Sequence, residues 1–496
     1  MTEEHRSLKQ IIDFRLEKLT KLRENGIDPY PYSFKKTHFS ESIKSSYDKL
    51  EGKTVIVAGR VMSLRKMGKA SFCHIKDNEG RMQAYVKRDD VGTDSYTNFK
   101  LLDIGDYLGI EGYVFKTKTG ETSIHASSLT ILSKSIRPIP IVKEKEGEEF
   151  DSFADKELRY RNRHLDLAVN DEVKDTFVKR AKIISSIRRF LDENGYVEVE
   201  TPILQSLYGG ANARPFVTHH NSLDQDFYLR IADELYLKRL IIGGIDKVYE
   251  LAKNFRNEGI DRNHNPEYTS LEFYEAYVDY KYMMDFVEQL IQYSAKDIDK
   301  SKVTWGDMEI DLSKKFDRKP IFELLTDAVG KDVSIMDEKD LLELCKKFEI
   351  DINPKSNYGQ LLDSLMSKLV EPNLIQPTFV TDYPKAISPL AKKHREGNPE
   401  LVERFELFIG GMEFANAFSE LNDPIDQRER FESQAQLGRA GDEEAHPVDE
   451  NFLEALECGM PPTGGVGIGI DRLVMLLTNN RWIKDVILFP TLREGK

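Results

Sequence analysis

The residues best suited to chemistry lie between positions 247 and 277, in the segment KVYELAKNFRNEGIDRNHNPEYTSLEFYEAY. Its alternating polar and apolar residues predict a strand, a long polar loop and a second strand. Successive side chains of a strand point to opposite faces, so one face of the first strand collects several polar groups. These groups are Glu250, Asn254, Arg256 and Glu258.

The returning strand adds a second polar row. Ser270, Glu272 and Tyr274 alternate with apolar neighbours, so they share one face above an apolar underside. An antiparallel pair of strands therefore gathers an arginine, glutamates and a tyrosine on one side, which indicates a binding surface for a charged ligand. A plain solvated sheet face is the alternative, although lysines and threonines would be more typical of one.

A second candidate site lies near the C-terminus, in PPTGGVGIGIDRLVMLL. The pattern predicts a glycine-rich strand that runs into a helix capped by Asp471. Arg472 then falls in the first helical turn, where the helix dipole disfavours a cation unless an anion such as a phosphate also binds there. Alternatively, Arg472 pairs with Asp471 or with a buried carboxylate. The segment lacks the P-loop lysine and the dinucleotide-binding glycine spacing, so neither of those folds is expected.

Other elements must position these residues. A helix is expected over about 173–194, ended by Gly195 and followed by the strand YVEVETPIL. Pro202 cannot donate to a sheet ladder, so that strand is expected at an edge or an interface. Residues from about 296 to 375 are rich in lysine and aspartate, with a helical pattern around 339–348, and look like an insertion.

The N-terminal part follows a different pattern. Residues from about 7 to 24 predict an amphipathic helix, and five short alternating runs between Thr54 and about Leu132 predict strands. Five such strands suit a small Greek-key barrel of the OB-fold type, which binds single-stranded nucleic acid through stacking aromatics and basic side chains.

The barrel region is also the most basic part of the chain. Nine lysines or arginines and two acidic residues lie between Lys53 and Arg88, although such a stretch is often only a solvated face. Phe72 and Gln83 are candidate contacts to nucleic acid, set among several arginines. The competing interpretation of Phe72 is a core aromatic.

Length and composition limit the class of protein. At 496 residues the chain is too long for one hydrophobic core, so at least two domains are expected. No apolar run reaches membrane-spanning length and the start MTEEHRSLKQ lacks a secretory signal, so a cytoplasmic protein without a membrane partner is expected. Three widely spaced cysteines argue against a zinc site or a disulfide framework. The net charge of -14 argues against general coating by nucleic acid.

The two candidate sites resemble motifs 2 and 3 of class II aminoacyl-tRNA synthetases, carried here by FRNE and GIGIDR, and the helix, strand and Pro202 resemble motif 1. GGANARPF, RIADELYLKRL, THHNSLD, SPLAKKHR and FSELND are similar to lysyl-tRNA synthetases of subclass IIb in particular. The resemblance covers nearly the whole chain. It implies an α+β fold, with an N-terminal OB-fold β-barrel, an antiparallel-sheet catalytic domain with helices, and a homodimer formed through motif 1.

The resemblance also implies domain bounds. An N-terminal helical extension is expected over 1–50, an OB-fold anticodon-binding domain over 51–145 and a class II catalytic domain over 155–496, with a helical insertion at about 300–375. The sequence RPIP at 137–140 and the acidic run KEKEGEEFD mark the linker between the two larger domains.

The activity that the resemblance implies is ATP-dependent ligation of L-lysine to tRNA(Lys). Lysine and ATP give lysyl-adenylate, and the terminal adenosine of the tRNA then takes the lysyl group. This chemistry rests on orienting the reactants and stabilising phosphate charge, so no nucleophilic side chain or general base is expected. The alternatives are an aspartyl- or asparaginyl-type synthetase, a paralogue that lysylates a protein, and a catalytically silent RNA-binding protein on the same scaffold.

The family's nucleotide contacts carry over to residues of this chain. Arg256 matches the arginine that bridges the α-phosphate of ATP and the amino-acid carboxylate, and Arg472 matches the arginine that holds the γ-phosphate. Tyr268 stands where the family usually has a phenylalanine that stacks on adenine, which keeps the π-face. Asn263 stands where the family commonly has an arginine. The other ATP-binding positions are Glu258, His264, Asn265 and Glu406.

Magnesium is the cofactor that the family implies. Glu406 and Glu413 match the carboxylates that hold Mg²⁺ against the polyphosphate, and hard oxygen ligands suit that ion.

The lysine pocket can be argued from charge. A substrate with an ammonium group at each end of an alkyl chain needs an anion at each end. The α-ammonium contacts of the family match Glu234 and the backbone of Gly210. The far end and a further substrate contact match Glu420, Tyr274, Glu272 and Asn416. Strict alternation turns Glu413 away from Glu420, so a bulge or twist after Gly410-Gly411 is required if both serve the site. In the barrel, the anticodon-binding positions match Phe72, Gln83 and Glu121.

Overall fold

A computed structural model describes residues 7–140, 143–145, 148–150, 153–211, 213–352, 356–396, 398, 400–439 and 448–493. Parts of the predicted acidic linker, the first six residues and Asn212 of the GGANARPF segment lie outside the described residues. The chain divides into two compact units, Met1–Asp155 and Lys156–Lys496. They are called here the barrel unit and the catalytic unit. Among the described residues, every helix is too short or too polar to cross a bilayer.

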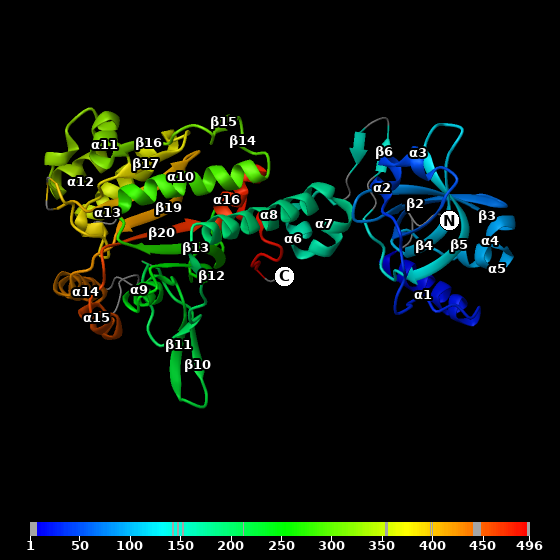
Figure 1. Cartoon of the computed structure of the whole chain (residues 1–496), viewed down its shortest axis with the longest axis horizontal. Helices are drawn as coiled ribbons and strands as arrows, with labels where there is room; N and C mark the ends of the chain where they lie inside the picture. Colours follow the sequence, from blue (N-terminus) through cyan, green and yellow to red (C-terminus); the bar gives the residue numbers. More distant parts are fainter. Residues whose placement is uncertain are drawn as a thin grey trace. The chain divides into compact units, whose positions relative to one another are not determined.

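The barrel unit is built on five strands that close on themselves (Figure 1). The strands pair in the order β1-β2-β3-β5-β4, and their inward side chains alternate with outward ones, so valines and isoleucines fill the interior. The predicted OB-fold barrel is therefore confirmed. The strands are β1 (Thr54–Lys66), β2 (Ala70–Lys76), β3 (Arg81–Lys87), β4 (Tyr107–Lys116) and β5 (Thr122–Ser133).

Short elements surround the barrel. They are α2 (Ser40–Ser45), α3 (Tyr47–Leu50), α4 (Arg88–Val91), α5 (Thr93–Phe99), β6 (Lys143–Lys145) and β7 (Glu148–Phe150). The first helix, α1 (Leu8–Glu24), begins at a capping box in which Ser7 and Gln10 satisfy each other's backbone N–H groups. It buries Leu19 and Leu22, as its amphipathic pattern predicts.

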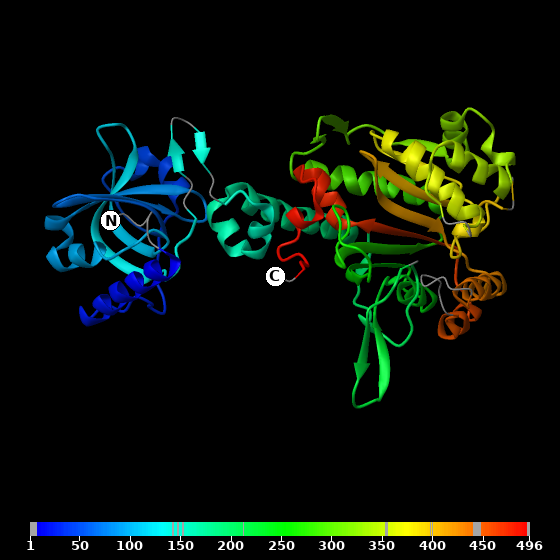
Figure 2. The ribbon, with the colours of Figure 1, turned by 180° about the vertical axis from the view of Figure 1, so that it is seen from behind.

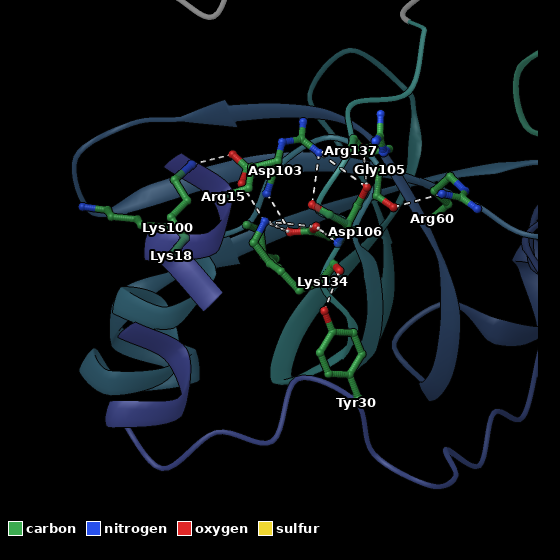
Figure 3. Close-up of polar contacts among 12 residues, drawn as sticks. Arg15, Lys18, Tyr30, Arg60, Lys100, Asp103, Gly105, Asp106, Lys134 and Arg137 are labelled. Atoms are coloured by element: carbon green, nitrogen blue, oxygen red, sulfur yellow. Dashed lines mark hydrogen bonds and ion pairs between the residues drawn. The ribbon is translucent and has the colours of Figure 1, made fainter. Parts of the chain in front are cut away.

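An ionic cluster also joins α1 to the barrel (Figure 3). The Nζ atom of Lys18 lies 2.5 Å from Asp103, and the buried Nζ of Lys134 lies 2.6 Å from Asp103 and 2.9 Å from Asp106. Arg15, buried beside the same cluster, donates to the carbonyl oxygen of Ser135 at 3.2 Å. The helix is thus held by charge-assisted hydrogen bonds as well as by apolar packing.

The catalytic unit is built on an eight-stranded sheet of order β16-β17-β18-β19-β20-β13-β12-β8 (Figures 1 and 2). Its central pairs are antiparallel, and only the outer pairs β16/β17 and β12/β8 are parallel. The strands are β8 (Val197–Glu198), β12 (Lys247–Phe255), β13 (Glu267–Ala276), β16 (Asp317–Pro320), β17 (Thr378–Thr381), β18 (Arg404–Ile409), β19 (Met412–Ser419) and β20 (Thr463–Gly469).

One face of this sheet is the apolar underside that the alternation predicts. Leu271, Phe273 and Ile468 from its strands pack in one core with three helices. These helices are α8 (Asp171–Glu193), α10 (Tyr280–Asp297) and α16 (Ile470–Thr478), and α10 lies along the sheet in both views (Figures 1 and 2). The opposite face packs against apolar side chains of the insertion at one side and of Glu234–Ile242 at the other, and polar side chains occupy the part between them.

The remaining elements flank the sheet. A second apolar core unites three helices of the predicted insertion with β17 and β18, and α12 lies where the helical pattern predicts it. A hairpin of β10 and β11 projects from the unit in both views (Figures 1 and 2). These elements are α6 (Lys156–Arg161), α7 (Arg163–Val169), β9 (Leu204–Gln205), β10 (Val217–His220), β11 (Gln225–Leu229), α9 (Glu234–Ile242), β14 (Lys302–Trp305), β15 (Met308–Asp311), α11 (Ile321–Val329), α12 (Glu338–Lys347), α13 (Tyr358–Leu365), α14 (Pro424–Arg439), α15 (Glu450–Glu457) and α17 (Ile483–Val486).

Two local predictions change. The strand expected over YVEVETPIL is reduced to β8, although it does lie at the sheet edge. The helix after the glycine-rich strand is not capped by Asp471, because α16 begins at Ile470 and its N-cap is Gly469. The Asp471 carboxylate instead pairs with Arg180 of α8 at 2.5 Å and accepts a hydrogen bond from the backbone of Thr269 at 2.8 Å. A tertiary ion pair therefore replaces the expected local cap.

Candidate active site

A cavity of about 410 Å³ lies over the polar face of the catalytic sheet. It brings together every residue that the sequence predicts for ATP, lysine and magnesium, from β12, β13, β18, β19, β20, the starts of α9 and α16 and the loops between them. The predicted residues that line it are Gly210, Glu234, Arg256, Glu258, His264, Asn265, Tyr268, Glu272, Tyr274, Glu406, Glu413, Asn416, Glu420 and Arg472.

The floor of the cavity depends on the pairing of β13 with the glycine-rich strand β20. Tyr274 lies opposite Gly465, and Glu272 lies opposite Gly467. A Cβ atom at Gly465 would lie 2.1 Å from Oε1 of Glu420 and 2.3 Å from the Tyr274 ring, so a side chain has no room there. The glycines of this strand thus let two functional side chains lie flat against the backbone.

Only some of the polar side chains predicted on the first strand of the pair line the cavity. Asn254 and Arg256 line the cavity, whereas Glu250, predicted on the same face, is buried and does not line it. The Glu250 carboxylate pairs with Arg230 at 2.6 Å and accepts a hydrogen bond from the hydroxyl of Thr201 at 2.7 Å. Glu250 therefore has its partners within the fold and is buried away from the ligand space.

The bulge that the sequence requires near Gly410-Gly411 is present. In the β18/β19 pair the register shifts, so that Phe408 lies opposite Glu413 while Leu407 lies opposite Ala415. The extra residue, Phe414, is buried. Because of this bulge, Glu413 and Glu420 both face the cavity despite their odd sequence separation.

One end of the cavity is acidic, and a buried lysine that the sequence interpretation missed lies behind its carboxylates. The Nζ atom of Lys238 forms ion pairs with both Glu234 and Glu420, and its side chain is fully buried. Burial raises the pKa of Glu420 to about 8, and the positive charge of Lys238 opposes that rise. Lys238 follows Glu234 by four residues on α9, which was the only sequence signal for it.

A second acidic pair lies beside the first. Burial raises the pKa of Glu272 well above its usual value, and the neighbouring carboxyl of Asp233 adds to the rise. Burial likewise raises the pKa of Asp233 to about 6. The Tyr274 hydroxyl donates to Glu272 at 3.1 Å, and the Asn254 amide donates to Asp233 at 3.1 Å. Two carboxyls that close together hold a proton between them more readily than two isolated ones.

The other end of the cavity carries two arginines. Within the described part of the chain, Nε of Arg256 is buried without a hydrogen-bond partner, and its guanidinium lies 5.3 Å from the centre of the Tyr268 ring. Arg472 donates to the backbone oxygen of Glu413 at 2.7 Å, and its guanidinium lies 3.5 Å from His264. Arg472 also lies 3.4 Å from the Glu413 carboxylate, which is 41% exposed, so its partner is neither Asp471 nor the buried carboxylate of the predicted alternative. Arg256, whose buried Nε has no partner among the described residues, is suited to an anionic ligand.

The motif 2 loop places its arginine elsewhere. Asn263 and His264 line the cavity, and His264 is oriented by hydrogen bonds to Asp261. Arg262 instead donates to the backbone oxygen of Arg481 at 2.7 Å and stacks near Trp482. Because Asn263 stands where the resembled family commonly has an arginine, this side of the cavity has one cation fewer.

Arg404 is a second lining residue that the sequence interpretation missed. Its guanidinium pairs with Glu406 and donates to the amide oxygen of Asn416 at 3.1 Å. The Tyr383 hydroxyl also donates to Glu406, at 2.8 Å. Arg404 precedes Glu406 by two residues on β18, so alternation alone places both on one face.

The comparisons with known proteins agree with this geometry. The family model for tRNA synthetases class II (D, K and N) matches residues 155–493, and the model for an OB-fold nucleic acid binding domain matches residues 55–132. Two proteins from strains of Porphyromonas gingivalis, named lysine–tRNA ligases, are 51% identical over 493 residues, which is 97% of this chain and 85% of theirs. A protein of the same name from Christiangramia forsetii is 50% identical over 491 residues, or 97% of this chain and 86% of its own.

The chain belongs to the lysine–tRNA ligase family of class II synthetases. The predicted anticodon residues of the barrel come from the paired strands β2 and β3 and from the residue before β5. Gln83 donates to the Glu121 carboxylate at 2.7 Å, and His74 lies 3.1 Å from the same group. Phe72 is half-buried on the neighbouring strand, with its ring centre 5.0 Å from that of Tyr85. The competing interpretation of Phe72 as a core aromatic does not hold, because the side chain lies outside the buried barrel core.

The sequence interpretation missed most of the aromatic surface around Phe72. Tyr85, Phe115, His125 and Tyr113 form a continuous series of ring contacts with centre separations between 4.7 and 6.4 Å. They come from β3, β4 and β5, so the pairing of β5 with both β3 and β4 brings them together. Such a surface is suited to stacking of unpaired bases.

Proposed function

We propose that the protein is a lysine–tRNA ligase that activates L-lysine with ATP and transfers the lysyl group to the terminal adenosine of tRNA(Lys). The observation that carries this proposal is the polarity of one cavity. Glu234 and Glu420 meet at its acidic end, while Arg256 and Arg472 lie where phosphates would be held. A shared cavity of this kind fits a substrate with two ammonium groups and one carboxylate beside a nucleotide.

The first step is an in-line displacement. An oxygen of the lysine carboxylate attacks the α-phosphorus of ATP, a new P–O bond forms, and the bond to the bridging oxygen of pyrophosphate breaks. Arg256 would contact both reacting groups, and the unpartnered Nε of that residue supports the assignment. Arg472 would hold the γ-phosphate, and Tyr268 would stack on the adenine.

The other predicted contacts have related roles in this proposal. Glu258, His264 and Asn265 would hold the nucleotide from the motif 2 loop, which lines the same cavity. Gly210 and Glu234 would receive the α-ammonium group of lysine. Glu272, Tyr274, Asn416 and Glu420 would surround the alkyl chain and the far ammonium group.

Glu406 and Glu413 fit a magnesium ion that enters with ATP. Both carboxylates line the cavity from adjacent strands, and the described residues hold no group of three or more acidic, histidine or cysteine side chains that could bind a metal alone. One or two carboxylates completed by substrate phosphates are typical of Mg²⁺. When bound, the ion would neutralise charge on the polyphosphate. Burial and the nearby Glu413 raise the pKa of Glu406 to about 7, so a cation is expected to favour its ionised form.

The protein is also proposed to act as a homodimer in the cytoplasm, where translation takes place. Motif 1 supports the dimer, because α8, β8 and the following segment expose the apolar residues Val178, Val197, Ile203 and Leu204. Sedimentation equilibrium on the full chain and on a Val197→Asp variant tests this: we expect a dimer that the charge weakens, and a monomeric wild type would contradict it.

The rival activities make different predictions in one assay. Amino-acid-dependent exchange of pyrophosphate into ATP should be measured with each of the twenty amino acids. We expect exchange with lysine alone. Exchange with aspartate or asparagine would indicate the rival synthetases of the same class, and no exchange would indicate a silent scaffold. A paralogue that lysylates a protein would exchange lysine but would not charge tRNA(Lys).

The barrel is proposed to read the anticodon through Phe72, Gln83 and Glu121. Replacing Phe72 by alanine should weaken binding of tRNA(Lys) by about 5- to 150-fold, the range expected for loss of one stacking contact. Tyr32→Ala is a matched control, because Tyr32 is a fully exposed aromatic of the same unit. Equal affinities of the two variants in filter binding would remove the stacking role.

A further inference from the structure

The carboxylates at the acidic end of the cavity have a buried cation as their partner. Lys238 projects from α9 to contact Glu234 on the same helix and Glu420 at the end of β19. Its side chain has no exposed surface, and those of Glu234 and Glu420 are 7% and 1% exposed. Lys238 therefore links the two carboxylates that the proposed function assigns to opposite ends of the substrate, without itself lining the cavity.

The ion pair with Lys238 leaves one oxygen of Glu420 open. Among the described residues, Oε1 of Glu420 is buried without a hydrogen-bond donor, and it lies against Gly465 at the cavity floor. Lys238 contacts Oε1 of Glu234 and Oε2 of Glu420. A buried carboxylate oxygen without a partner is costly in a fold that has no use for it, so it indicates a ligand that donates there.

The local charges show why a cation is needed. Glu234 on α9, Asp233 before that helix, Glu272 on β13 and Glu420 after β19 all lie at this end, together with the Tyr274 hydroxyl. Lys238 is the positive group that acts on Glu420, and its own pKa is raised by Glu234 and Glu420. Without its charge, burial would favour protonated carboxyls, which bind an ammonium group less well.

We propose that Lys238 is a positioning residue for lysine binding, which holds Glu234 and Glu420 as oriented anions on either side of its ammonium group so that their free oxygens receive the substrate. This role rests on the proposed function and deepens it. Lys238 does not touch the substrate and takes no part in the transfer of the adenylyl group.

The test uses the full-length enzyme and compares Lys238→Met with the wild type in lysine-dependent pyrophosphate exchange. The methionine keeps the length of the side chain and removes its charge. We expect kcat/KM for lysine to fall by about 100-fold near neutral pH, as for removal of one member of a buried charge pair, while KM for ATP stays within about threefold. The rise of kcat/KM with pH should also move to higher pH, since Glu420 loses the cation that favours its ionised form.

Lys247→Met is the matched control. Lys247 pairs with Glu275 at 2.7 Å in the same unit, but it does not line the cavity and has no assigned role. We expect its lysine KM and pH profile to match those of the wild type. The same profile in Lys238→Met would overturn the positioning role, whereas absence of lysine exchange in the wild type would overturn the proposed function instead.

A second variant keeps the inference testable if Lys238→Met folds poorly. Lys238→Ala leaves a cavity that a small alkylammonium ion can enter, so added n-propylammonium should restore lysine exchange by about tenfold or more. It should not activate Lys238→Met, in which the space is filled. Restoration by the uncharged n-propanol to the same extent would show that volume alone matters and would contradict a role for the charge.

Discussion

The barrel unit and the catalytic unit each bury a lysine between two carboxylates, and the two clusters differ in what is left unpaired. In the barrel, Lys134 lies 2.6 Å from Asp103 and 2.9 Å from Asp106. The Nζ atom of Lys18 lies 2.5 Å from Oδ1 of Asp103 (Figure 3). The backbone N–H groups of Asp103 and Ser135 each donate to the Asp106 carboxylate at 2.7 Å. Both carboxylates of this cluster thus have their partners within the barrel unit, and we call such a cluster closed.

The cluster around Lys238 is open. Its cation contacts Glu234 and Glu420, yet an oxygen of Glu420 faces a cavity of about 410 Å³ without a donor among the described residues. Burial raises the pKa of Asp106 and of Glu420, the latter to about 8, so it is the hydrogen-bond partners and not the pKa values that distinguish the two clusters. A buried ion pair is thus a structural feature when its lone pairs are satisfied and a candidate site when they are not.

The comparison predicts that Lys134→Met damages stability and spares chemistry. Removing one partner of a closed buried cluster should destabilise the barrel unit by about 3–5 kcal/mol, because Asp106 loses its cation and Asp103 keeps only Lys18. Hydrogen exchange of the full-length protein, followed strand by strand, should show the loss in β4 and β5, while lysine-dependent pyrophosphate exchange persists.

Lys44→Met is the control for Lys134→Met. Lys44 lies 3.9 Å from Glu41 in an exposed pair of the same unit, so its removal should change stability by less than about 0.5 kcal/mol. Equal protection in the two variants would show that the buried cluster contributes no more than a surface pair.

Glu420→Gln should have the reverse effect. The amide keeps the shape of the side chain and removes the negative charge, so kcat/KM for lysine should fall by about 2–4 kcal/mol in transition-state terms, or roughly 30- to 1,000-fold. The stability of the catalytic unit should change little, because the lost charge is not fully satisfied in the free protein. A stable variant with unchanged lysine kinetics would contradict the open-site interpretation.

Gly465→Ala tests whether the floor of the open site is as tight as it looks. Its Cβ would lie 2.1 Å from Glu420, whereas a Cβ at Gly467 would meet its nearest atom at 3.8 Å. We expect Gly465→Ala to destabilise the catalytic unit by about 1–3 kcal/mol and to displace Glu420, and Gly467→Ala to destabilise it by less than about 0.5 kcal/mol. Thermal unfolding of the two variants side by side gives the comparison, and equal shifts would remove the packing argument.

The smallest expected effect is a pH dependence. Since the pKa of Glu420 is raised to about 8, kcat/KM for lysine should rise by roughly tenfold between about pH 7 and about pH 9, and this limb should be absent in Glu420→Gln. The raised pKa also means that Glu420 stabilises the fold at low pH and loses this contribution as the pH rises toward 8. If kcat/KM of the wild type does not change between about pH 7 and about pH 9, a pKa near 8 for Glu420 is contradicted.

Much of the site could be predicted because its signals are local. Strict alternation along β12 and β13 is enough to place Arg256, Glu272 and Tyr274 on one face, and the predicted bulge follows from the spacing of Glu413 and Glu420. Lys238 escaped prediction because a lysine on an amphipathic helix is ordinarily a surface residue, and its burial depends on Glu420, which is far away in the sequence. Asp471 was assigned as a cap for the same reason, since its partner Arg180 lies on a distant helix.

The sequence by itself determined the class of both units, the polar and apolar faces of their strands and many of the residues that line the cavity, because these depend on periodicity and on motifs within short stretches of chain. Only the tertiary structure decided which charges are satisfied. Whether a buried carboxylate is closed, as around Lys134, or open, as at Glu420, depends on the atoms that other elements bring within hydrogen-bonding distance, and no local pattern records them.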